Sequence, residues 1–199
     1  KKEMDVDRVI KFSSGYGTKD KALKAVQWAA KLLVATSYPG DTENGAKLLG
    51  LFKACVLHRK AFRFGQILGN LRTLNRLLTE VNADGAAKWG VKVAQQLFWI
   101  GYFLCDHIVW LGEIKFVKID VPYWKLKSFQ MFFGAVSCAT YLSTTAPGSK
   151  TSPKFALQSA KLVCDIINVG KLAQVNNCTD FQMSLAGLIS ALIHCYTLY

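Results

Sequence analysis

The spacing of apolar residues constrains the fold of this chain more than any other feature of its sequence. Nearly every apolar segment repeats at intervals of three and four residues, which is the period of an amphipathic helix. Strict alternation of polar and apolar residues is rare, and the glycine-centred turns that join hairpin strands are missing. The sequence therefore predicts an all-α protein.

Turn signals divide the chain into six predicted helices. The breaks contain glycine, proline or paired asparagines, and they fall at residues 15–17, 39–40, 120–122, 146–149 and 176–177. The predicted helices cover residues 19–37, 44–80, 86–117, 123–145 and 153–175, and a last helix runs from the asparagine pair to residue 199. No linker is long enough to separate two domains, so we predict one domain over residues 1–199.

Composition combines two properties that rarely occur together. The chain is 51% hydrophobic and yet carries a formal net charge of +12 at pH 7. Long uncharged runs argue against nucleic-acid binding, which would need exposed aromatic residues or a base-reading insertion helix. An anionic lipid surface accounts for both properties, because each lysine or arginine near the membrane contributes about 1 kcal/mol of attraction. We therefore expect an anionic phospholipid membrane as a partner, and no nucleic acid.

Charge and hydropathy separate a basic amphipathic region, residues 1–92, from an apolar region, residues 93–199. The first holds 17 Lys and Arg against 8 Asp and Glu, and the second holds 8 against 5. The basic half is predicted to face the cytosol. A membrane span needs about 20 apolar residues, and the candidates are Leu97–Gly112, Phe129–Ala146 and Phe181–Tyr199. We expect a membrane-associated helical bundle with long amphipathic helices and one to three membrane-embedded helices; the alternative is that all three segments are core helices of a soluble bundle.

The segment from Arg59 to Leu78 carries the most informative pattern. On a helical wheel its large apolar side chains share one arc, its polar side chains occupy the opposite arc, and two arginines lie at the borders. A helix that lies in the membrane plane has this arrangement, although a bundle face with solvated cations has it too. The predicted membrane-binding residues are Arg59, Lys60, Arg63, Phe64, Ile67, Leu68, Leu71, Arg72, Leu74, Arg76 and Leu78.

Asp106 and His107 form an ionisable pair inside an apolar run. In a bilayer such groups are costly and usually functional, whereas in a soluble core they would be a hydrogen-bonded pair. A third interpretation, which we prefer, places them at the lipid interface between Trp99 and Trp110. We predict Asp106, His107 and Trp110 as interfacial or intramembrane residues.

The sequence contains no recognisable catalytic constellation. Its three histidines are scattered, no paired carboxylates sit at helical spacing in a plausible cleft, and no glycine-rich phosphate loop follows a strand. The six cysteines stand singly, which is typical of small buried hydrophobes in a reducing compartment. We therefore expect no enzyme activity, no metal and no cofactor.

Several segments resemble the peroxin-11 family along nearly the whole chain. They are Lys19-Asp20-Lys21, Val26-Gln27-Trp28, Lys31-Leu32-Leu33, Arg59-Lys60-Ala61-Phe62-Arg63-Phe64-Gly65, Asp106-His107-Ile108-Val109-Trp110-Leu111 and Gly187-Leu188-Ile189-Ser190. The elements RKxFRxG and DHxxWL are fairly specific in combination, and either alone would be weak.

The resemblance implies a peroxisomal membrane protein that elongates and tubulates the organelle to promote its division and proliferation. The family's membrane-active helix would fall at about Arg59 to Leu78, on the cytosolic face, and its C-terminal span at about Phe181 to Tyr199. The resemblance also implies a homo-oligomer that cooperates with a dynamin-related GTPase and its tail-anchored fission adaptors. A pore-forming channel for metabolites in the peroxisomal membrane is the alternative function.

Overall fold

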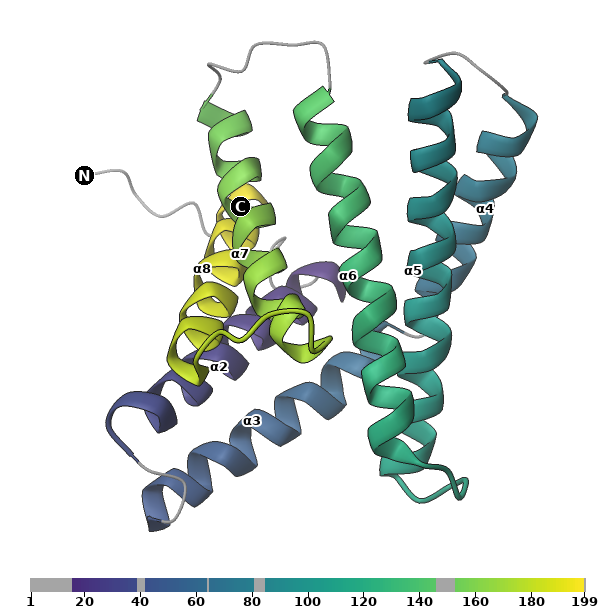
Figure 1. Cartoon of the computed structure of the whole chain (residues 1–199). Helices are drawn as coiled ribbons and strands as arrows, with labels where there is room; N and C mark the ends of the chain where they lie inside the picture. Colours follow the sequence, from purple (N-terminus) through teal and green to yellow (C-terminus); the bar gives the residue numbers. More distant parts are fainter. Residues whose placement is uncertain (1–15, 39–41, 64, 81–84, 146–152, 199) are drawn as a thin grey trace. The chain divides into compact units, whose positions relative to one another are not determined.

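The computed structural model describes residues 16–38, 42–63, 65–80, 85–145 and 153–198. Within these ranges every regular element is an α-helix, which confirms the all-α prediction. The helices, shown in Figure 1, are α2 (Tyr16–Thr36), α3 (Glu43–Phe62), α4 (Gln66–Thr79), α5 (Ala86–Glu113), α6 (Val121–Thr145), α7 (Pro153–Leu172) and α8 (Asp180–Leu198).

These helices group into two compact units. The described parts of residues 1–62 and 179–199 form the first unit, which contains α2, α3 and α8. Residues 63–178 form the second, which contains α4, α5, α6 and α7. The prediction of a single domain stays a prediction.

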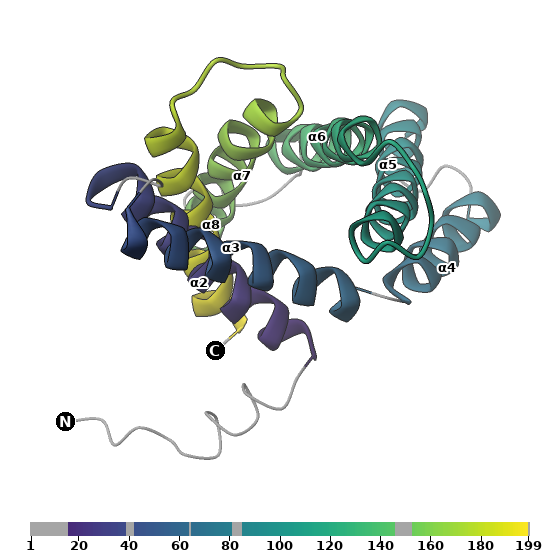
Figure 2. The same ribbon diagram turned by 90° about the horizontal axis from the view of Figure 1, so that it is seen from below.

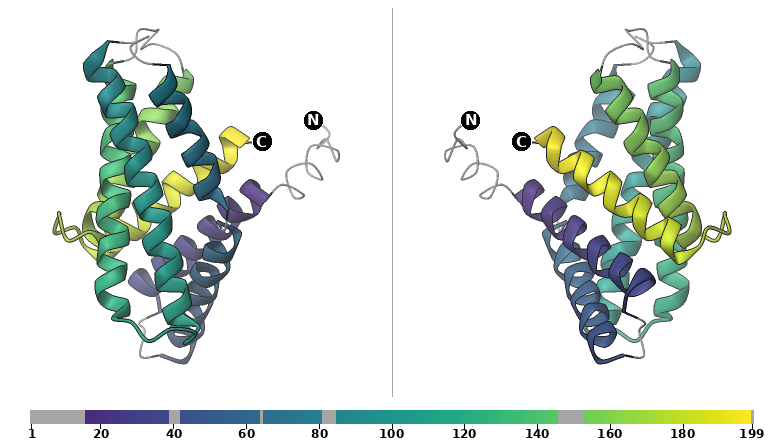
Figure 3. Two further views of the ribbon diagram at one scale, coloured as in Figure 1. Left: turned by 90° about the vertical axis from the view of Figure 1, so that its right-hand side faces the viewer. Right: turned by 90° about the vertical axis from the view of Figure 1, so that its left-hand side faces the viewer.

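In the first unit α2 packs against both α3 and α8, as Figure 3 shows. Trp28 is only 4% exposed, and its ring meets that of Phe52 edge-on at a centroid distance of 6.0 Å. The buried guanidinium of Arg59 donates one hydrogen bond to Asp20 at 2.9 Å and another to Gln27 at 2.6 Å. The seam between α2 and α3 therefore combines an aromatic contact with a buried charged network.

Helix α8 buries Met183 and several small side chains, and it turns five large apolar side chains outward. Ser184, Ser190 and Ala191 are completely buried, and the Lys24 ammonium donates to the Ser190 hydroxyl at 2.9 Å. Small residues at a helix interface allow the two backbones to approach closely. The exposed large side chains recur at helical spacing, and they are Phe181, Leu185, Ile189, Leu192 and Tyr196.

In the second unit the helices α4, α5, α6 and α7 follow one another in a curved row, which Figure 2 shows end-on. Each helix packs against the next one along the chain. Between α5 and α6 lies a cluster of rings with centroid distances of 4.8 to 5.8 Å, formed by Trp99, Tyr102, Phe103 and Phe132. Gly134 allows α6 to approach α5, because a Cβ atom there would lie 2.7 Å from the Phe98 ring.

The prediction of one helix over residues 44–80 is wrong, because the structure has two helices there. Helix α3 ends at Phe62 and α4 begins at Gln66. Between them Gly65 has a φ of 87°, in the left-handed region that glycine adopts without steric cost. The two helices belong to different units.

Within the described ranges, no helix has the combined length and apolar character that a membrane span requires. The expectation of one to three membrane-embedded helices therefore finds no support in the structure. Polar residues lie in each helix that contains a candidate, and they include Lys88, Lys92 and Asp106 in α5, Lys125 and Lys127 in α6, and Asp180, Gln182 and His194 in α8.

Candidate membrane-binding site

Helix α4 packs on α5 but leaves much of its apolar arc exposed. Leu68 is 67% exposed, Leu71 45% and Leu78 51%, and we call these three side chains the leucine ridge. Ile67 and Leu74, on the same predicted arc, are half-buried. The arc is thus divided between residues that contact the rest of the unit and residues that extend into the surroundings.

Two exposed arginines accompany the leucine ridge. A helix turns by about 100° per residue, so Arg72 lies about 40° around the helix from Leu68, and Arg76 lies about 40° further in the same direction. Long arginine stems can lie along an apolar surface while the guanidinium groups stay in a polar layer. The exposed side of α4 therefore presents an apolar strip bordered by cations.

The remaining residues of the predicted site lie elsewhere. Arg59 and Lys60 belong to the last turn of α3, where they are 9% and 5% exposed. Both residues belong to the first unit, whereas α4 belongs to the second. Phe64 lies outside the described residues.

Asp106 has a buried partner that the sequence did not indicate. The Arg63 guanidinium donates to the Asp106 carboxylate at 3.1 Å and to the Tyr102 hydroxyl, and it lies 5.7 Å from the centroid of the Tyr102 ring. Asp106 is 7% exposed. Its neighbour His107 is half-buried and bonds through Nδ1 to the carbonyl one turn earlier at 2.5 Å, and Trp110 is half-buried.

Tyr102 and Trp89 are the residues at this site that sequence reasoning missed. Tyr102 accepts a hydrogen bond from Arg63, and the Trp89 indole N–H donates to the Leu77 carbonyl of α4 at 2.7 Å. One signal was available in the sequence, because a carboxylate in an apolar run needs a cation or donors nearby. Nothing in the sequence identified Arg63 as that cation.

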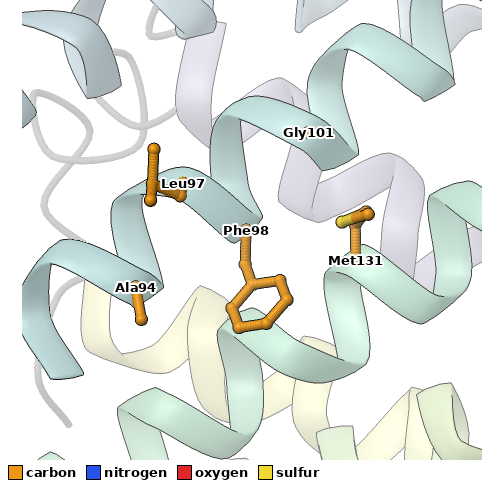
Figure 4. A pocket seen from close by; sticks show the side chains of 5 residues that line it. All are labelled: Ala94, Leu97, Phe98, Gly101 and Met131. Atoms are coloured by element: carbon orange, nitrogen blue, oxygen red, sulfur yellow. The ribbon is translucent and has the colours of Figure 1, made fainter.

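An apolar hollow of about 380 Å³ lies beside the seam of α5 and α6, and Figure 4 shows it. Its lining residues are Ala94, Leu97, Phe98, Gly101 and Met131. Leu97 is 54% exposed, and Leu104, seven residues further along the same side of α5, is 50% exposed. The second unit thus carries exposed apolar side chains on α5 as well as on α4.

None of the six cysteines forms a disulfide bond within the described residues. Burial raises the pKa of four of them, Cys55, Cys105, Cys138 and Cys195, and the adjacent Asp106 carboxylate raises that of Cys105 further. These four thiols are therefore protonated at neutral pH. Within the described part of the chain, no three His, Cys, Asp or Glu side chains gather closely enough to hold a metal ion.

Comparison with known proteins agrees with the resemblance seen in the sequence. The family model described as "Peroxisomal biogenesis factor 11 (PEX11)" matches residues 6–147, a stretch that includes α2 to α6. Neither the curated proteins nor the solved structures gave a match. Because the match covers well over half of the sequence, the chain belongs to the PEX11 family of peroxisomal biogenesis factors.

Proposed function

We propose that this protein binds the peroxisomal membrane through the leucine ridge of α4 and that this insertion bends and elongates the membrane. One observation carries the proposal: Leu68, Leu71 and Leu78 stay exposed while α4 is packed on α5. Insertion therefore requires no helix to leave the unit. The ridge and its bordering arginines meet the two needs of an interfacial helix, which are apolar area and cations for the lipid phosphates.

Curvature follows from the depth of insertion. An interfacial helix places its apolar face about 5–10 Å into the boundary between headgroups and acyl chains. Side chains at that depth add area to one leaflet and none to the other, so the membrane bends towards the opposite leaflet. Many copies inserted side by side would turn a flat surface into a tubule.

The exposed apolar side of α8 supports membrane contact independently of α4. Its outward row of large side chains contains no charged residue, so contact with lipid would not transfer a charged side chain from this row into the hydrocarbon region. We include α8 in the proposal as a second lipid-contacting element in the first unit.

Three further parts of the proposal come from family resemblance and from the distribution of charge. We propose that the protein acts as a homo-oligomer, with the basic residues 1–92 on the cytosolic side. We also propose that it works with a dynamin-related GTPase and tail-anchored fission adaptors. The expectation that the chain is not an enzyme likewise stays a prediction, for a family of biogenesis factors.

The pore hypothesis, which the family resemblance also permits, loses the residue observation that suited it. That observation was the pair Asp106 and His107, two polar groups inside an apolar segment. Asp106 is instead buried against Arg63 and Tyr102, which accounts for a carboxylate at that position without a pore. No other feature of the described residues favours a channel.

The proposal is tested with the full-length protein and vesicles rich in anionic lipid. We expect the protein to float with the vesicles at low salt and electron microscopy to show tubules. Leu71→Glu places a charge on the ridge and should abolish both effects. Gln66→Glu adds the same charge at an exposed polar position of α4 and is the matched control, expected to retain both. Failure of the unaltered protein to bind or deform these vesicles would overturn the proposal.

A further inference from the structure

The sequence element RKxFRxG ends in the second unit, where its Arg63 contacts the element DHxxWL. Arg63 of the first donates to Asp106 of the second at 3.1 Å, and it also donates to the Tyr102 hydroxyl. The two charged side chains are only 12% and 10% exposed. Salt screens a buried pair much less than an exposed one, so this contact persists at ionic strengths that weaken surface attraction.

Arg63 also stands at the entry to α4. The Gln66 N–H donates to the Arg63 carbonyl at 3.0 Å, so one residue contacts α5 through its side chain and the first turn of α4 through its backbone. At the other end of α4, the Trp89 indole bonds to the Leu77 carbonyl at 2.7 Å. Between these two attachments α4 contains no fully buried residue and has no side-chain N-cap.

A helix attached in this way needs a device that fixes its rotation. Burial of apolar surface is favourable, so a loosely held α4 would roll until Leu68 and Leu71 packed on α5. The observed structure instead keeps both leucines exposed. A charged hydrogen-bonded contact at the entry to the helix opposes that roll, because rolling would pull a buried guanidinium away from its carboxylate.

We infer that Arg63, Asp106 and Tyr102 form a positioning clasp, which fixes the rotation of α4 on α5 and keeps the leucine ridge facing outward. The clasp acts through α4 and does not itself touch lipid. This inference rests on the proposed membrane binding by the ridge, and it assigns a role to a buried ion pair.

The test uses the full-length chain with Asp106→Asn, which keeps the shape of the side chain and removes its charge. Hydrogen exchange should become faster at the amides of α4 and stay unchanged in α6 and α7. If the outward-facing state falls to about a tenth of the population, vesicle binding weakens about tenfold. Glu113→Gln is the matched control, because it removes a different ion pair of α5, to Lys125 at 3.0 Å, and should change neither measurement.

A second background separates positioning from general loss of stability. In a chain whose three ridge leucines are serines, Asp106→Asn should weaken vesicle binding no further, although it should still accelerate exchange in α4. If Asp106→Asn fails to fold, Tyr102→Phe decides, because it removes one hydroxyl and leaves the ion pair. Tyr102→Phe should then accelerate hydrogen exchange in α4 relative to the Glu113→Gln control. If it does not, the inference of a clasp is refuted.

The two proposals fail in different ways. If Asp106→Asn leaves both α4 exchange and vesicle binding at the level of the unaltered protein, the clasp is refuted and ridge binding is untouched. If the triple-serine chain binds vesicles as well as the unaltered protein does, membrane binding by the ridge is refuted. The role of the clasp in membrane binding is then refuted too.

Discussion

Replacing the three leucines of the ridge by serine should remove the apolar free energy that α4 contributes to membrane binding. Full burial of a leucine contributes about 1.5–3 kcal/mol. The exposed fractions of 67%, 45% and 51% scale this to about 1–2 kcal/mol for Leu68 and about 0.7–1.5 kcal/mol each for Leu71 and Leu78. The three together amount to about 2.5–5 kcal/mol, which corresponds to binding weaker by about 60-fold to about 4,000-fold.

Flotation with anionic vesicles at low salt measures this change directly. Because these side chains are exposed in the folded protein, the triple variant should unfold at nearly the same temperature as the unaltered protein. Leu104→Ser on α5 alters a leucine of similar exposure outside α4 and shows whether any exposed leucine has the same effect. Binding of the triple variant within about threefold of the unaltered protein, with its fold intact, would refute the reasoning.

Three other results are expected. Arg76→Ala should weaken vesicle binding about fivefold at low salt and hardly at all at high salt, because one exposed cation contributes about 1 kcal/mol of screened attraction; a titration of binding against salt measures this. Asp20→Asn should lower the free energy of unfolding by about 3–5 kcal/mol in denaturant titrations, because it leaves the buried Arg59 facing a neutral amide. Burial raises the pKa of the Cys105 thiol in the folded protein, so the thiol loses its proton at a lower pH in the unfolded chain than in the folded one. The free energy of unfolding should therefore fall as pH rises above about 8.5. Melting temperatures from pH 7 to pH 10 should show that decline, and Cys105→Ala should make it shallower.

The helices were predictable because their period and their breaks are local properties. The end of α6 at Thr145 and the start of α7 at Pro153 agree with the turn residues between them, whereas the predicted loop at residues 146–149 lies outside the described residues. The sequence predicts a continuous helix across Gly65, because a single glycine inside a helical pattern costs only about 1 kcal/mol and does not by itself end a helix. The division into two units depends on packing between distant segments, which no local pattern reports.

The site was predictable only in part for the same reason. Periodicity identified the apolar arc of α4, but only the fold shows that Ile67 and Leu74 are half-buried while Leu68 extends outward. Asp106 was recognised as unusual, whereas its partner Arg63 lies 43 residues away in the sequence. Spacing along one helix identifies shared faces, and it does not identify which charges meet across two helices.

Helix α8 exposes large apolar side chains, so the stability of its attachment depends on the surrounding medium. In water, the exposed part of the outward row from Phe181 to Tyr196 leaves apolar area hydrated. In an apolar medium that penalty disappears, while the burial of Ser184, Ser190 and Ala191 and the bond from Lys24 of α2 to Ser190 remain. The medium at its outer face therefore changes the free energy of α8 even when its contacts with α2 stay the same.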